Sequence, residues 1–92
     1  MSSTTDYLLA FSSFYKAAYA QETLADRKFT VSLRKLPPGL LQTCGYGVSL
    51  RTDGLEGLKR AMRLLEEREI RHRGVFSPRR EANRVIYDKV YL

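Results

Sequence analysis

The hydrophobic positions of the chain follow two spacings, one typical of strands and one typical of helices. Tyr7 to Phe11 is a short apolar run, which predicts a strand in the centre of a covered sheet. From about Ser13 to Arg27, apolar residues recur three or four positions apart, which predicts a helix capped by a serine hydroxyl. The stripe of this helix consists of Phe14, Ala17, Ala18, Leu24 and Ala25, interrupted by the polar Gln21.

Two segments with alternating apolar and polar residues follow and predict half-buried strands at Thr30 to Leu36 and at Tyr46 to Leu50. The connection between them, Leu36 to Gly45, contains Pro37-Pro38-Gly39, which ends the first strand. Hairpin connections usually take about 2–5 residues, so a connection of this length is either functional or loosely ordered.

The clearest amphipathic helix spans about Gly54 to Glu69, and Asp53 with Glu56 predicts its N-cap. Its apolar positions at helical spacing are Leu55, Leu58, Met62 and Leu65. The remaining segments predict a strand at 70–76, a polar linker at 77–83 that contains Pro78, and a last strand at 85–92.

The order β-α-β-β-α-β with an added C-terminal strand predicts an α+β fold of the ferredoxin-like, split β-α-β type. Two helices then cover one face of an antiparallel sheet. The other face is expected to be open, and either this face or the C-terminal strand could pair two copies into a homodimer. The chain divides into a frayed N-terminus at 1–6, a ferredoxin-like domain at 7–76 and a basic extension at 77–92.

The composition of the chain limits the classes of protein to which it can belong. The chain has 92 residues, of which 43% are hydrophobic and 28% charged, so it forms one small globular domain. A single cysteine and a single histidine exclude a disulfide framework, a CxxC redox pair and a multi-cysteine or multi-histidine metal site. We therefore expect no metal and no cofactor. The chain has neither an apolar run of roughly 20 residues nor a signal-peptide pattern, so we expect no membrane association and a cytoplasmic location.

A net charge of +6 indicates an anionic partner. Ferredoxin-like RNA-binding domains stack bases on aromatic residues of a glycine-rich strand motif, which Tyr46-Gly47-Val48 and Gly74-Val75-Phe76 do not supply. We therefore favour protein over nucleic acid as the partner. The alternative to a partner-binding surface is a solvated basic face that glutamates partly neutralise. The candidate partner-binding residues are Arg71, Arg73, Arg79 and Arg80. His72 lies between two of these arginines, which predicts a lowered pKa and an ordinary place in a strand.

Cys44 is the candidate for chemistry, with Thr43 before it and Gly45 after it in the long connection. The glycine leaves the sulfur accessible and allows backbone N–H groups to turn toward it. A reactive thiolate also needs nearby cations. The candidate cations are Arg34, Lys35 and Arg51. The alternative is that a lone cysteine acts as a small buried hydrophobic residue.

Leu36-Pro37-Pro38, followed by Thr43-Cys44-Gly45, an apolar strand and a capped helix, resembles the selenium/sulfur carrier protein-like family over about Tyr7 to Phe76. The resemblance implies that Cys44 binds sulfur or selenium as a persulfide or selenosulfide. It also implies a cysteine desulfurase as donor and a sulfur- or selenium-using enzyme as acceptor. The chain departs from the family at Gln42-Thr43, where members often have serines, and in its extension at 77–92.

A carrier of this kind is a substrate of enzymes rather than a catalyst. It requires one cysteine without a neighbouring thiol, because a second thiol would discharge the persulfide as a disulfide. The alternatives are a basic RNA- or protein-binding module, or a structural domain in which Cys44 is inert. RNA binding that is sensitive to salt and survives Cys44→Ser would support the RNA-binding module.

Overall fold

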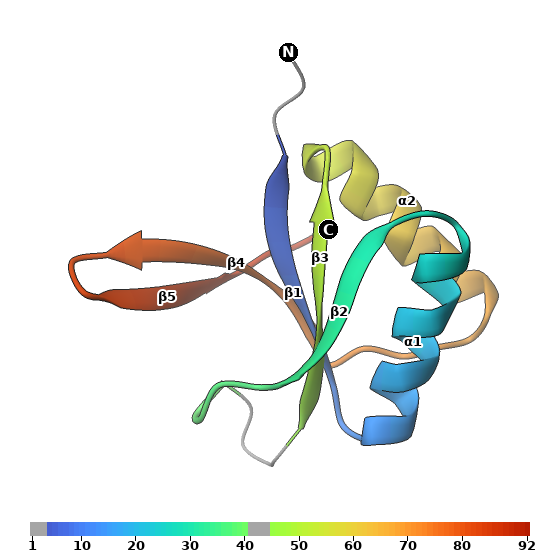
Figure 1. The fold of residues 1–92 in the computed structure, drawn as a ribbon, viewed down its shortest axis with the longest axis horizontal. Coiled ribbons are helices and arrows are strands. Elements are labelled where there is room, and N and C mark those ends of the chain that lie inside the picture. The colour runs from blue at the N-terminus through green and yellow to red at the C-terminus, as the bar shows by residue number, and fades with distance from the viewer. Residues whose placement is uncertain (1–3, 41–44) are drawn as a thin grey trace.

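The computed structural model describes residues 4–40 and 45–92. Five strands form one antiparallel sheet in the order β2-β3-β1-β4-β5, and two helices cover one of its faces (Figure 1). This arrangement confirms the predicted ferredoxin-like α+β fold with an added strand. The elements are β1 (Thr5–Phe11), α1 (Phe14–Asp26), β2 (Thr30–Lys35), β3 (Tyr46–Thr52), α2 (Gly54–Glu67), β4 (Gly74–Glu81) and β5 (Arg84–Lys89). Neither α1 nor α2, the helices of the described ranges, is long and apolar enough to cross a membrane.

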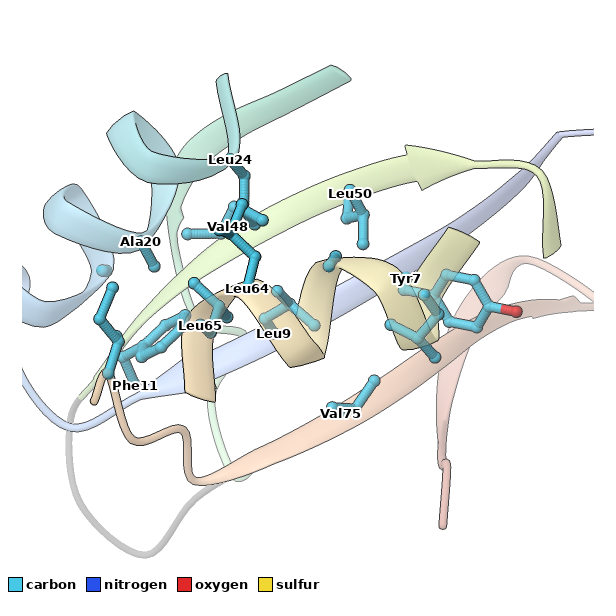
Figure 2. Close-up of a cluster of buried hydrophobic side chains, with 14 residues drawn as sticks. Tyr7, Leu9, Phe11, Ala20, Leu24, Val48, Leu50, Leu64, Leu65 and Val75 are labelled. Atoms are coloured by element: carbon cyan, nitrogen blue, oxygen red, sulfur yellow. The ribbon is translucent and has the colours of Figure 1, made fainter. Parts of the chain in front are cut away.

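The main core lies between the sheet and the two helices (Figure 2). Side chains of a strand alternate between faces, so every second residue of β1 contacts the helices. Leu9 and Phe11 of β1 are fully buried there, together with Val48 and Leu50 of β3. Each fully buried side chain of this size contributes about 1.5–3 kcal/mol to the free energy of unfolding. The helix α2 contributes Leu58, Ala61, Leu64 and Leu65.

The buried face of α1 differs from the predicted stripe. Ser13 caps this helix as expected, because its Oγ accepts a hydrogen bond from the Lys16 backbone N–H at 3.2 Å. Phe14, by contrast, is 47% exposed, and its ring lies edge-on to Tyr46 with centroids 5.3 Å apart. Mostly small residues form the buried face, which lets the helix lie close to the sheet. These residues are Ala17, Ala20, Thr23 and Leu24.

Both helices end in the same Schellman geometry, although neither has glycine at the left-handed position. Lys28 and Glu69 hold φ values of 69° and 57°. The next residue in each case donates its backbone N–H to a carbonyl of the last helical turn: Phe29 to Leu24 at 3.1 Å, and Ile70 to Leu65 at 2.9 Å. Ile70 then enters the core, so residues 70–73 form a connection rather than the start of the predicted strand.

Asp53 is the N-cap residue of α2 and Glu56 lies in the first turn, as predicted, but the Asp53 side chain does not cap the helix. Asp53 makes no side-chain hydrogen bond to the first turn of the helix. Its Oδ1 instead accepts hydrogen bonds from the Thr52 hydroxyl and from Arg60 Nη2, both at 3.1 Å. A hydrogen bond from its own backbone is the largest cause of the lowered pKa of Asp53, and the hydrogen bond from Thr52 and the charge of Arg60 lower it further.

The face opposite the helices is less open than expected. Leu8, Ala10 and Phe76 are almost fully buried there. Leu36, Leu40 and Tyr87 pack against them and form a second, smaller cluster. A homodimer through this face stays a prediction, but the centre of the face is already covered by residues of the same chain.

The linker predicted at 77–83 is wrong, because most of it belongs to β4. The hairpin of β4 and β5 turns at Ala82 and Asn83, and Ala82 has the positive φ of 54° that tight hairpin turns use. Pro78 does not interrupt β4, because β1 pairs with 74–76 alone and leaves Pro78 with a neighbour strand on one side. The boundary expected at residue 76 therefore divides a continuous strand. At the N-terminal end, Thr5 and Asp6 belong to β1 rather than to a frayed end.

Candidate functional site

The connection between β2 and β3 begins and ends at one end of the sheet. The two strands pair from Thr30 opposite Arg51 to Lys35 opposite Tyr46. Beyond the last pair, the Leu36 backbone N–H donates to the Gly45 carbonyl at 3.2 Å. The ten residues at 36–45 therefore leave and re-enter the sheet at adjacent positions, as the sequence predicted.

The first half of this connection packs on the sheet. Leu40 donates its backbone N–H to the Pro37 carbonyl at 3.3 Å, and Gly39 between them has a φ of 84°. This is the geometry of a type II turn, in which glycine avoids the strain that a side chain would add. Leu36 and Leu40 contact the cluster around Leu8, so the turn is held against the face opposite the helices.

Thr43 and Cys44 lie outside the described residues, and Gly45 is the nearest described neighbour of the cysteine. Arg34 and Lys35, two of the predicted cations, lie opposite Gly47 and Tyr46 and are exposed. They occupy the same end of the sheet as Gly45. Strand alternation places their side chains on opposite faces.

Arg51, the third predicted cation, lies at the other end of β3. It lies six positions after Gly45 along the strand, a path of about 20 Å. Its guanidinium binds Asp6 of β1, with Nε 2.8 Å from Oδ1. The structure thus places Gly45, Arg34 and Lys35 at one end of the sheet, with the two cationic side chains on opposite faces, and leaves Arg51 at the other end. The hydrogen bond from Arg51 is the main cause of the lowered pKa of Asp6.

A groove of about 300 Å³ crosses the face opposite the helices, from β2 to the β4–β5 hairpin. The alternation of polar residues in β2 and β3 could have indicated its floor, but no sequence signal indicates that the hairpin borders it. Its polar residues include Asp6, Ser32, Arg34, Ser49 and Arg51, and Pro78 and Tyr87 border it from the hairpin.

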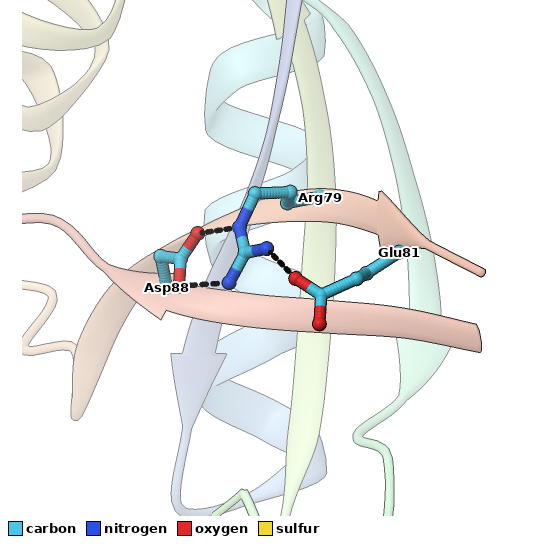
Figure 3. Close-up of polar contacts among 3 residues, drawn as sticks. All are labelled: Arg79, Glu81 and Asp88. Carbon is cyan, nitrogen blue, oxygen red and sulfur yellow. Dashed lines mark hydrogen bonds and ion pairs between the residues drawn. The ribbon is translucent and has the colours of Figure 1, made fainter.

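The four arginines predicted to bind a partner do not form one surface. Arg71 and Arg73 lie in the connection before β4, whereas Arg79 and Arg80 lie in the hairpin, on opposite faces of β4. Arg79 is already engaged: its Nε lies 2.8 Å from Asp88 Oδ2, and its Nη1 binds Glu81 (Figure 3).

His72 lies in the connection between α2 and β4, not in a strand. Although much of the residue is exposed, it lines a cavity with apolar side chains such as Met62 and Leu92. This partial burial is the main cause of its lowered pKa, and the positive charge of Lys89 adds to it. The predicted direction is confirmed, but burial and Lys89 cause the shift rather than the flanking arginines.

An aromatic surface that the sequence had not indicated adjoins the end of the sheet at Gly45. Tyr46 follows Gly45 directly, and Phe14 packs against it from the start of α1. Phe14 is 47% exposed and Tyr15 is 83% exposed. Exposed aromatic side chains are enriched where proteins contact one another.

Within residues 4–40 and 45–92, no three histidine, cysteine, aspartate or glutamate side chains are grouped as metal ligands would be. Comparisons with protein-family models, with curated proteins and with solved structures found no match. The assignment of function therefore depends on the residues and geometry of this chain.

Proposed function

We propose that this protein carries sulfur or selenium on Cys44, as a persulfide or selenosulfide, between two protein partners. The observation that carries the proposal is the position of the only cysteine: it falls in the long connection between β2 and β3, next to the buried Gly45. Leu36 and Gly45 hold the ends of that connection together. A single cysteine in a segment outside the paired strands suits a group that must meet a donor and an acceptor in turn.

The transfer needs no oxidant or reductant. The Cys44 thiolate attacks the terminal sulfur of a persulfide on the donor, a cysteine desulfurase. The sulfur–sulfur bond of the donor breaks, its cysteine leaves as a thiolate, and a new bond forms on Cys44. A thiolate of the acceptor then attacks the outer sulfur in the same way. The chain has no second cysteine that could discharge the persulfide within the molecule.

Two features beside Gly45 support contact with protein partners. Arg34 and Lys35 supply positive charge, which favours a thiolate and an acidic partner surface. Phe14 and Tyr15 supply exposed aromatic area at the same end of the sheet. A basic RNA-binding module would instead use the face opposite the helices. On that face, the strands β1 and β3 carry Leu8, Ala10, Gly47 and Ser49. None of these residues has an aromatic side chain on which a base could stack.

The proposal requires that Cys44 reacts while the protein is folded. We expect iodoacetamide to alkylate the folded protein at least as fast as it alkylates free cysteine at the same pH. The double variant Arg34→Gln/Lys35→Gln is expected to react more slowly, because two positive charges at the end of the sheet where Gly45 lies are lost. Lys59→Gln/Arg84→Gln, which removes two exposed positive charges on α2 and β5, is the matched control and should react at the wild-type rate. Alkylation that proceeds only in denaturant would overturn the proposal.

A further inference from the structure

A cavity of about 400 Å³ opens between the end of α1 and the side of α2 that carries Arg60, Arg63 and Glu67. Thr52, the last residue of β3, also lines it. The cavity therefore lies at the opposite end of β3 from Gly45 and has no part in the carrier proposal. Its residues come from segments far apart in the sequence, which pack together because α1 and α2 cover the same face of the sheet (Figure 1).

The lining of this cavity is strongly basic. Arg27 and Lys28 come from the end of α1, and Arg60 and Arg63 come from α2, whereas Glu67 is the one acidic side chain in the lining. Among the ion pairs of the described residues, Arg60 alone of these four cations has a carboxylate partner, Asp53. Four cations around one concave surface repel one another, and Glu67 and Asp53 balance only part of their charge.

Helix stability accounts for only part of this arrangement. Arg27 and Lys28 suit the negative end of the α1 dipole. Arg60 and Arg63 lie on α2, so the α1 dipole does not stabilise them. Their spacing of three positions places two like charges side by side on α2. Lys28 occupies a left-handed position with a φ of 69°, where glycine would be the unstrained residue. A ligand that neutralises the charge left unbalanced by Asp53 and Glu67 would explain why these four cations share one cavity.

We infer that this cavity binds the phosphate groups of a small phosphorylated molecule. Its volume lies within the range of about 300–1,000 Å³ that small-molecule sites occupy. Arginine guanidinium groups match phosphate oxygens through paired hydrogen bonds, and a phosphate chain carries enough negative charge to balance several cations. Phe29 and Leu64 add apolar surface to the lining, against which the rest of such a molecule can pack.

The inference can be tested by calorimetric titration of the full chain with inorganic tripolyphosphate and with ATP, in buffer without divalent cations. We expect both to bind and the binding to weaken as sodium chloride is raised. Tighter binding of ATP than of tripolyphosphate would indicate that the natural ligand is a nucleotide whose base or sugar packs on Phe29. Equal binding would indicate that the cavity recognises the phosphate chain alone. Both results support the inference. Failure of both probes to bind at millimolar concentration would overturn it.

Variants can show whether binding depends on the residues of this cavity or only on the overall surface charge. Arg63→Gln is expected to weaken binding about tenfold, since one charged hydrogen-bonding partner is lost. Lys59→Gln, the matched control on the same helix, lies outside the lining and should bind as the wild type does. Lys28→Gly should weaken binding while raising the melting temperature, a pair of effects that damage to the fold cannot produce. An equal loss of affinity in Lys59→Gln and Arg63→Gln would contradict the assignment.

Discussion

The side chain of Leu36, the residue after β2, packs against Gly47 of the neighbouring strand β3. A Cβ atom at position 47 would lie 2.7 Å from Leu36 Cδ2, and it would also lie 2.9 Å from Leu8 Cδ1 and 3.2 Å from the Leu9 carbonyl oxygen. Leu36 therefore packs directly over the backbone of β3, in space that only glycine leaves free. This contact fixes the start of the connection that contains Cys44.

We expect Gly47→Ala to lower the free energy of unfolding by about 1–3 kcal/mol, because the added methyl group overpacks this contact. Urea denaturation followed by circular dichroism measures the change. The double variant Gly47→Ala/Leu36→Ala should lose less than the sum of the two single variants, since the shorter side chain makes room for the methyl group. Strict additivity would show that the contact with Leu36 does not cause the effect.

Glu69→Gly is expected to stabilise the protein by about 0.5–1 kcal/mol. Glu69 has a φ of 57°, a conformation that costs a residue with a side chain about 1–2 kcal/mol. Part of this gain is offset, because glycine has more freedom in the unfolded chain. Glu69→Ala is the control: it removes the same carboxylate but keeps the strain, so it should not stabilise the protein. Comparable gains in both variants would mean that charge, rather than backbone strain, is responsible.

The ion pair of Asp6 with Arg51 makes stability depend on pH in the acid range. The pKa of Asp6 is lowered in the folded chain. At a pH near 3.8, the ordinary carboxyl pKa, Asp6 therefore binds fewer protons in the folded chain than in the unfolded chain. The contribution of the pair is therefore present above that pH and is lost as the pH falls through the lowered pKa.

We expect the melting temperature of Asp6→Asn to fall less than that of the wild type between pH 6 and pH 3. The remaining fall reflects Asp53 and Asp88, whose pKa values are also lowered. The difference between the two proteins should shrink at high salt, because the pair is exposed. Parallel melting curves for both proteins across this range would show that Asp6 does not contribute.

The order of elements could be predicted because each core element has its own periodicity. The apolar run at Tyr7 to Phe11 became the central strand, and the amphipathic segment after Asp53 became α2. Both strands of the β4–β5 hairpin have a sequence signal, but the continuation of β4 to Glu81 and the tight turn after it do not, because the local signals there are misleading. Pro78 is normally a reason against a strand, and Ala82-Asn83 is not one of the glycine-containing pairs that mark tight turns.

The sites were less predictable, because they depend on residues brought together from distant segments. Arg51 could be named as a candidate cation, but only the pairing of β1 with β3 places it beside Asp6. The arginines and lysine at 27, 28, 60 and 63 lie on two helices and become one cavity only when both helices pack on the same face. The segment 41–44, on which the carrier prediction depends, lies outside the described residues.

The most direct measurement for the carrier proposal is the intact mass of the full chain after incubation with a cysteine desulfurase, its cofactor and cysteine. The wild type is expected to gain one sulfur atom, to lose it on treatment with a thiol reductant, and to pass it to an acceptor thiol. Cys44→Ser should gain nothing under the same conditions, and repetition with a selenium donor would then distinguish the two elements. An unchanged mass of the wild type, or an equal gain in Cys44→Ser, would contradict the carrier function.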